Sequence, residues 1–162
     1  MRLERNLGAT FSQHVHASAS DGALRLIIPA SEWSVRCGLQ SIRYGLERLS
    51  LSDDALSNVE LVIAELLNNI VEHAYKDRVD GMIEVELLFI GNSILCKVTD
   101  DGLPMPNGQI PPGQPKDLSG DLEDLPEGGF GWLLIRELTQ DLHYGRHDNR
   151  NMLSCSIRVK NT

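Results

Sequence analysis

The segment "ELLNNIVEHAY", residues 65–75, places five polar side chains in a stretch that otherwise has the composition of an apolar helix. It belongs to a longer helical pattern that follows Ser52, a favourable N-cap residue, contains no proline and ends before Gly81. At about 100° per residue, the apolar positions gather into one stripe. The stripe consists of Leu56, Val59, Ile63, Leu66, Leu67, Ile70 and Ala74. The sequence therefore predicts a long helix with a core-facing side.

The opposite side of this predicted helix is polar. Its polar residues are Asn58, Glu65, Asn69, Glu72 and His73. Glu65 and Asn69 lie one turn apart, and Leu61 and Val62 fall on the same side, so we expect it to be partly covered. Most charged helix faces are simply solvated. A carboxylate beside a carboxamide also suits a general base next to a hard-cation ligand. The helix by itself leaves both interpretations open.

The composition narrows the class of protein. A chain of 162 residues with 41% hydrophobic residues is expected to form a globular domain. The net charge is −8, and no run of Lys or Arg indicates direct nucleic-acid binding, whereas ATP remains compatible with an acidic chain. The three cysteines have no metal-type spacing and are expected to be buried apolar residues. No signal core and no stretch of ~20 apolar residues is found, which predicts a cytoplasmic protein without a membrane segment.

The remaining elements follow from caps, turns and periodicity. We expect a strand over residues 23–30, a helix over 31–50 capped by Ser31, and a hairpin of strands 82–90 and 93–99 joined at Gly91. A third helix is expected after the glycines at 128–131, followed by a second hairpin that turns near 147–151. Residues 1–22 are predicted to be an N-terminal tail, and residues 23–162 a single domain.

A long loop separates the first hairpin from the third helix, and both of its ends are distinctive. Residues 102–131 hold six of the seven prolines and half of the glycines. Upstream, "VTDDGLP" places Asp100 at a strand end before Gly102; this is a common turn, although such a carboxylate can accept a hydrogen bond from an exocyclic amine. Downstream, "EGGFGWLLIREL" leads from glycines into a helix start. This end is either a plain hinge or a phosphate cradle of free N–H groups.

The order of these parts is more specific than any one of them. A helix with E-x-x-x-N, a strand ending in D-x-G, a long loop and a G-x-G turn into a helix together resemble the GHKL ATP-binding superfamily over residues 23–160. The segments "ELLNNIVEHAY", "DDGLP" and "EGGFGWLLI" are most similar to the small anti-sigma-factor serine/threonine kinases of the RsbW and SpoIIAB type. The resemblance implies a Bergerat-type fold. This is a two-layer α/β sandwich with a mostly antiparallel mixed sheet, helices on one face and an ATP lid over residues 102–127.

The resemblance also implies a site for ATP and Mg²⁺. The residues that match the binding motifs are Asn69, His73, Asp100, Gly102, Pro104, Gly129, Phe130 and Gly131. By this similarity Glu65 is the catalytic base that orients the attacking hydroxyl, Asn69 ligates Mg²⁺, and Asp100 reads adenine. Residues 129–131 are expected to contact the phosphates, while His73 is expected to support the site rather than act in it.

The implied function is that of an ATP-dependent serine/threonine protein kinase. Such a protein phosphorylates a STAS-domain anti-anti-sigma partner and sequesters a sigma factor or another regulator. The resemblance also implies a homodimer that uses residues 31–50. Two alternatives stay open: a non-catalytic, ATP-gated protein-binding switch, and a slow ATPase in which water replaces the hydroxyl. Glu65 favours the kinase over the switch, since a pure binder does not need that carboxylate.

Overall fold

A single antiparallel sheet forms one layer of the molecule. The structure is a computed structural model that describes residues 16–160 except 21, 77 and 114–129. Its strands are β1 (His16–Ser20), β2 (Ala23–Pro29), β3 (Met82–Ile90), β4 (Ser93–Asp100), β5 (Gln140–His147) and β6 (Arg150–Arg158). They are arranged in the order β1-β2-β3-β4-β6-β5, and every pair of neighbours is antiparallel. The parallel pairing that a mixed sheet requires is therefore absent among the described strands.

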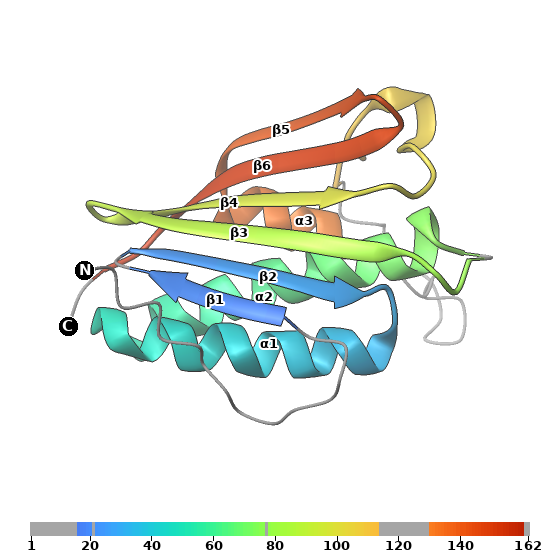
Figure 1. Ribbon diagram of the computed structural model, residues 1–162. Coiled ribbons are helices and arrows are strands. Elements are labelled where there is room, and N and C mark those ends of the chain that lie inside the picture. The colour runs from blue at the N-terminus through green and yellow to red at the C-terminus, as the bar shows by residue number, and fades with distance from the viewer. Residues whose placement is uncertain (1–15, 21, 77, 114–129, 161–162) are drawn as a thin grey trace, which may run out of the picture.

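The helices form the second layer and cover one face of this sheet (Figure 1). They are α1 (Glu32–Leu46), η1 (Glu47–Leu49), α2 (Asp53–Asn69), η2 (Ile70–Ala74) and α3 (Phe130–Leu138), with a short turn η3 (Pro106–Gly108) in the loop. Ser31 and Ser52 cap α1 and α2 as predicted, and each side chain accepts a backbone N–H at 3.2 Å. The two-layer α/β sandwich is thus confirmed. No helix among the described residues is long and apolar enough to cross a membrane.

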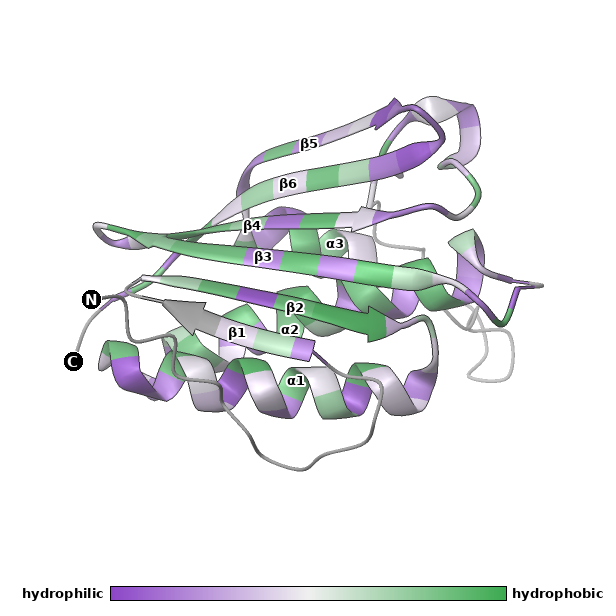
Figure 2. Ribbon diagram, in the orientation of Figure 1, coloured by the Kyte–Doolittle hydropathy of each residue, from purple (hydrophilic) through white to green (hydrophobic). Residues whose placement is uncertain are grey.

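The core lies between the two layers. Alternate residues of β2, β3, β4 and β6 point toward the helices, and hydrophobic residues are concentrated in β2, β3 and β4 (Figure 2). The predicted stripe of α2 is buried against them at Leu56, Val59, Ile63, Leu66 and Leu67. Cys37, Cys96 and Cys155 are buried and free, as expected.

Val62 confirms the expectation that the polar side of α2 is partly covered. It was placed on the polar side, yet its exposed fraction is 0%. The reason is that α2 packs against α1 and α3 as well as facing the sheet, so its buried arc is wider than a single stripe. The accessible polar residues of α2, Glu65 and Asn69 among them, lie on the remaining part of its surface, which we call the polar arc.

The predicted N-terminal tail is wrong for residues 16–20, which form the edge strand β1. Ala17 pairs with Leu26 of β2 and packs against the core. The sequence "HASAS" lacks the alternating large residues from which a strand is predicted. An edge strand does not need them, because it can be held mainly by backbone pairing with its neighbour. Residues 1–15 of the predicted tail lie outside the described residues.

Candidate functional site

The polar arc of α2 meets the first turn of α3 at Gly131. A Cβ atom added to Gly131 would lie 2.5 Å from Oε2 of Glu65 and 3.8 Å from Nδ2 of Asn69. Only glycine therefore allows the Glu65 carboxylate to come this close to the backbone of α3. The structure brings together Glu65, Asn69 and Gly131, three of the residues that the sequence singled out.

Asn69 carries a buried polar atom that the described residues do not satisfy. Its Nδ2 atom is buried and has no hydrogen-bond partner among the described groups. Leaving such an atom unpaired costs about 1–3 kcal/mol. The oxygen and nitrogen of a side-chain amide exchange places when the group flips, so either atom can face the same space. An unsatisfied amide one turn from a carboxylate is a feature expected of a site that is completed by a ligand.

The other end of the loop begins at Asp100, the last residue of β4. The residue is 5% exposed, and its Oδ1 accepts two hydrogen bonds of 2.8 Å, from the backbone N–H of Gly102 and from Nδ2 of Asn151. No hydrogen bond from the described residues reaches Oδ2. Burial raises the pKa of Asp100, and the two hydrogen bonds oppose that rise. Oδ2 is therefore the atom of this carboxylate that a ligand can address.

Gly102 and Leu103 attach this end of the loop to the end of η2. The N–H of Leu103 donates to the carbonyl of Ala74 at 2.8 Å, and a Cβ at Gly102 would lie only 2.6 Å from that carbonyl oxygen. Asp101 continues the attachment, since its N–H donates to the Tyr75 hydroxyl at 2.9 Å and its carboxylate is hydrogen-bonded to the same hydroxyl. The Asp101 carboxylate is thus engaged by Tyr75, whereas Oδ2 of Asp100 remains available to a ligand.

The helix α2–η2 therefore connects the two ends of the long loop. Glu65 faces Gly131 at one end, Asn69 follows one turn later, and Ala74 contacts Gly102 at the other end. At 1.5 Å per residue, Glu65 and Ala74 are separated by roughly 13 Å along the helix. The candidate site is elongated, with one carboxylate beside a helix N-terminus and a second carboxylate at a strand end.

The first part of the loop is held against α3. The guanidinium of Arg136 donates to the carbonyls of Ile110 and Pro111 at 3.3 and 2.8 Å. Nearer β4, the N–H of Met105 donates to the Tyr144 hydroxyl at 3.1 Å. Of the predicted lid, residues 102–113 are therefore described and fastened at several points, whereas residues 114–127 lie outside the described residues.

The remaining predicted site residues are exposed or lie outside the described residues. His73 lies in η2 with its imidazole largely exposed, 3.9 Å from the Glu72 carboxylate. Pro104 is exposed in the loop, and Phe130 is the half-exposed first residue of α3. Gly129 lies outside the described residues. The assignments of His73, Pro104, Gly129 and Phe130 to a nucleotide site stay predictions.

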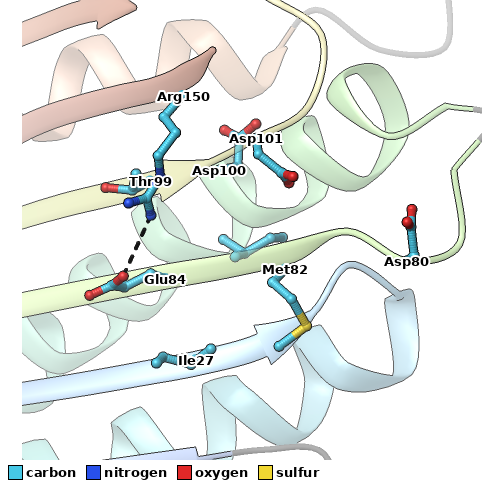
Figure 3. A pocket seen from close by; sticks show the side chains of 9 residues that line it. Ile27, Asp80, Met82, Glu84, Thr99, Asp100, Asp101 and Arg150 are labelled. Carbon is cyan, nitrogen blue, oxygen red and sulfur yellow. Dashed lines mark ion pairs between the residues drawn. The ribbon is translucent and has the colours of Figure 1, made fainter. Parts of the chain in front are cut away.

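A hollow of about 320 Å³ lies near Asp100 on the helix-free face of the sheet (Figure 3). Asp100 lines this hollow, but the other charged residues of its walls are already paired. Glu84 bonds to Arg25 at 2.6 Å and lies 3.8 Å from Arg150, while Asp80 and Asp101 both pair with Arg78. Because the charges on the sheet face of this hollow are paired within the protein, we place the candidate site on the helix-covered side, along α2 and η2.

Comparisons with known proteins agree with this architecture. Residues 28–157 match the family described as "Histidine kinase-like ATPase domain". "Serine-protein kinase RsbW" of Listeria monocytogenes serovar 1/2a is 30% identical over 123 residues, which cover 74% of this chain and 76% of that protein. The protein of the same name from Bacillus cereus strain AH820 is 31% identical over 107 residues, 65% of this chain and 66% of that protein.

A similar fold is found among solved structures. The crystal structure of the RsbU and RsbW domains of Rv1364c from Mycobacterium tuberculosis matches with a TM-score of 0.59 at 17% identity. The match covers 85% of this chain and 33% of that chain, so this chain spans about a third of its length. This likeness concerns the fold alone.

Proposed function

Because the chain belongs to the histidine kinase-like ATPase domain family, with RsbW serine-protein kinases among its relatives, we propose that it is an ATP-dependent serine/threonine protein kinase. Its proposed substrate is a STAS-domain anti-anti-sigma protein, and its second partner a sigma factor or another regulator, in the cytoplasm. The observation that supports this best is the Glu65 carboxylate set against the first turn of α3, with the unsatisfied amide of Asn69 beside it.

The two ends of the site suit the two ends of ATP. Oδ2 of Asp100 accepts a hydrogen bond from the exocyclic amine of adenine, whereas the carbonyl oxygen that guanine has at that position is repelled. The phosphates lie at the N-terminus of α3, near Phe130 and Gly131, where free N–H groups and the helix dipole favour anions. Gly129 is proposed to contribute to the same turn.

The residues present fit a magnesium ion. Mg²⁺ commonly takes one or two protein oxygens and completes its octahedral shell with water and phosphate oxygens. Asn69 supplies a carboxamide whose Nδ2 atom has no hydrogen-bond partner among the described residues, and it lies one turn from Glu65. We propose that the Asn69 side-chain oxygen holds the ion. When bound, the ion neutralises negative charge on the phosphates during transfer.

Glu65 is proposed to act on the incoming hydroxyl. Its carboxylate orients a serine or threonine hydroxyl of the partner and takes its proton while the hydroxyl oxygen attacks the γ-phosphorus. The bond between that oxygen and phosphorus forms, the bond from phosphorus to the β-γ bridging oxygen breaks, and ADP leaves. Gly131 contributes by its lack of a side chain, which leaves room for the carboxylate beside α3.

A homodimer through residues 31–50 is part of the proposal. The outer face of α1 presents Trp33, 64% exposed, and Tyr44, 54% exposed. At about 100° per residue, Trp33 and Tyr44 lie within about 20° of each other on this face, away from the centre of the buried stripe of α1. Aromatic side chains are enriched in protein interfaces, so these two exposed side chains support a partner-binding face on α1. Light scattering on a Trp33→Glu, Tyr44→Glu double variant should show a smaller particle than the wild type.

The experiment that tests the proposed function follows the label of [γ-³²P]ATP. The protein is incubated with labelled ATP, Mg²⁺ and a candidate STAS-domain protein. Label on a serine or threonine of the partner supports the kinase. Release as inorganic phosphate, with none on the partner, indicates a slow ATPase. Label that stays on intact, protein-bound ATP indicates an ATP-gated binding switch.

A further inference from the structure

The structure surrounds Asp100 with a hydrogen-bond cluster that the proposed nucleotide chemistry does not yet use. We propose that Asn151 is a positioning residue: with Tyr144 and Arg146 it fixes the Asp100 carboxylate for adenine and fastens it to the start of the loop at Gly102. This inference rests on the proposed function, because it assumes that Asp100 reads the base.

Asn151 lies directly opposite Asp100 in the pairing of β4 with β6, and it is 5% exposed. Its Nδ2 atom lies 2.8 Å from Oδ1 of Asp100 and 2.9 Å from the carbonyl oxygen of Leu103. Its Oδ1 atom lies 2.7 Å from the Tyr144 hydroxyl and 2.6 Å from Nη1 of Arg146. Every polar atom of this buried amide is therefore satisfied.

These partners settle which way the amide points. A guanidinium only donates hydrogen bonds, so the Asn151 atom that faces Arg146 is the oxygen. The nitrogen then faces Asp100, where an ionised carboxylate only accepts. The hydrogen bonds of the cluster are therefore consistent with one orientation of the amide, in which Asn151 accepts from Arg146 and donates to Asp100.

These hydrogen bonds also fix the atom of Asp100 that faces the ligand. Oδ1 of Asp100 already receives the donors of Asn151 and Gly102, so the carboxylate cannot rotate without losing both bonds. Oδ2 is held in one place as a pure acceptor. An acceptor in a fixed place distinguishes an exocyclic amine from a carbonyl oxygen, whereas a carboxylate that rotates or takes up a proton does so less well.

The same three side chains hold the start of the loop. Arg146 donates to the carbonyl of Gly102 at 2.9 Å, Asn151 donates to that of Leu103, and the Tyr144 hydroxyl accepts from the N–H of Met105. The β5–β6 hairpin thus connects the base-reading carboxylate to the backbone that leaves β4. Loss of Asn151 should weaken both attachments together.

Asn151 also influences the charge on Asp100. Burial raises the pKa of this carboxyl, and neighbouring Asp101 raises it further, while the Asn151 and Gly102 donors and the charge of Arg146 lower it. The phenol of Tyr75, whose pKa is raised mainly by burial, and that of Tyr144 also lie nearby. Removing the Asn151 donor removes one of the lowering causes. Asp100 should then take up a proton at a higher pH, and its ability to accept from adenine should be lost from that pH downward.

The experiment compares Asn151→Ala and Asn151→Asp with Ser154→Ala, a change on the helix-free face of the same strand. Calorimetry measures ATP·Mg²⁺ and GTP·Mg²⁺ binding between about pH 5 and about pH 8. Asn151→Ala should weaken ATP binding at least ~10-fold at neutral pH. It should also reduce the ratio of ATP affinity to GTP affinity. The loss of ATP binding on acidification should begin at a higher pH than in the wild type. Ser154→Ala should match the wild type throughout.

Asn151→Asp tests whether the Nδ2 donor of Asn151, rather than the size of its side chain, positions Asp100. It keeps the size of the side chain but sets a second carboxylate against Asp100, so ATP binding should fall at least as far as in Asn151→Ala. Wild-type affinity, selectivity and pH profile in either variant would overturn the inference. If urea unfolding shows that both variants are unfolded, Tyr144→Phe replaces them. It removes only one hydroxyl, and ATP binding should weaken about 3-fold; an unchanged value would equally overturn the inference.

Two further measurements separate this inference from the proposed function. If the wild type does not bind ATP, or if Asp100→Asn binds ATP and GTP as the wild type does, the proposed reading of adenine fails. If Asp100→Asn loses ATP while Asn151→Ala keeps it, the proposed function stands and only the role of Asn151 fails.

Discussion

Replacing Gly131 by alanine should damage the proposed phosphoryl transfer without damaging the fold. The added Cβ would lie 2.5 Å from Oε2 of Glu65 and 3.4 Å from its Cδ. Ordinary van der Waals contact with a side-chain oxygen requires a distance near 3.4 Å, so the carboxylate has to withdraw by about 1 Å. The atom that moves is the end of a flexible side chain, and no backbone atom has to follow it.

The size of the effect follows from this displacement. Misplacing a catalytic group by about 1 Å costs on the order of 10²-fold in rate. The free energy of unfolding should be unchanged or higher by up to about 1 kcal/mol, because alanine favours a helix more than glycine does. We therefore expect Gly131→Ala to fold normally and to transfer phosphate to its partner roughly 100-fold more slowly.

The assay is single-turnover transfer from [γ-³²P]ATP to the STAS-domain partner, run beside urea unfolding of the same preparation. Gly145→Ala is the matched control, since a Cβ at Gly145 would meet no atom within 4 Å. Its transfer rate should equal that of the wild type. A stable Gly131→Ala variant with a wild-type transfer rate would refute the reasoning that the position of the Glu65 carboxylate controls the reaction.

Three further changes test other parts of the site. Asn69→Ala should leave the fold intact and greatly weaken ATP·Mg²⁺ binding in calorimetry; an unchanged affinity would remove Asn69 from the proposed metal site. Asp100→Asn should reduce ATP affinity and the preference for ATP over GTP, and equal affinities for the two nucleotides in the wild type would contradict its role. Gly102→Ala should lower the free energy of unfolding by about 1–3 kcal/mol, because its Cβ would meet the backbone carbonyl of Ala74 at 2.6 Å; an unchanged urea midpoint would argue against that close contact.

Local signals were sufficient to predict most of the fold. The caps at Ser31 and Ser52 mark the starts of α1 and α2, and the turn at Gly91 separates β3 from β4, as the structure confirms. These features depend on residues close together in the chain, so they can be read from short windows. β1 was missed because its small residues are held by pairing with β2 rather than by a hydrophobic pattern of their own.

The site was predictable only in part, for a related reason. The spacing of Glu65 and Asn69 is visible on a helical wheel, and the structure brings both to Gly131. The contact between Asp100 and Asn151 depends on the register of two strands that are 51 residues apart in the chain, which no local pattern specifies. Asn151 had no distinguishing signal in the sequence, since an asparagine near a hairpin turn is ordinary.

The most direct test of the central claim compares Glu65→Gln with the wild type in transfer from [γ-³²P]ATP to the partner. The glutamine keeps the size of the side chain and its place beside Gly131 but cannot take a proton from a hydroxyl. We predict that the variant binds ATP·Mg²⁺ and captures the partner as well as the wild type does, yet labels its serine or threonine at least ~100-fold more slowly. Equal labelling by the two proteins, or a wild type that binds both ATP and the partner without ever labelling it, would contradict the claim that Glu65 is the base of a protein kinase.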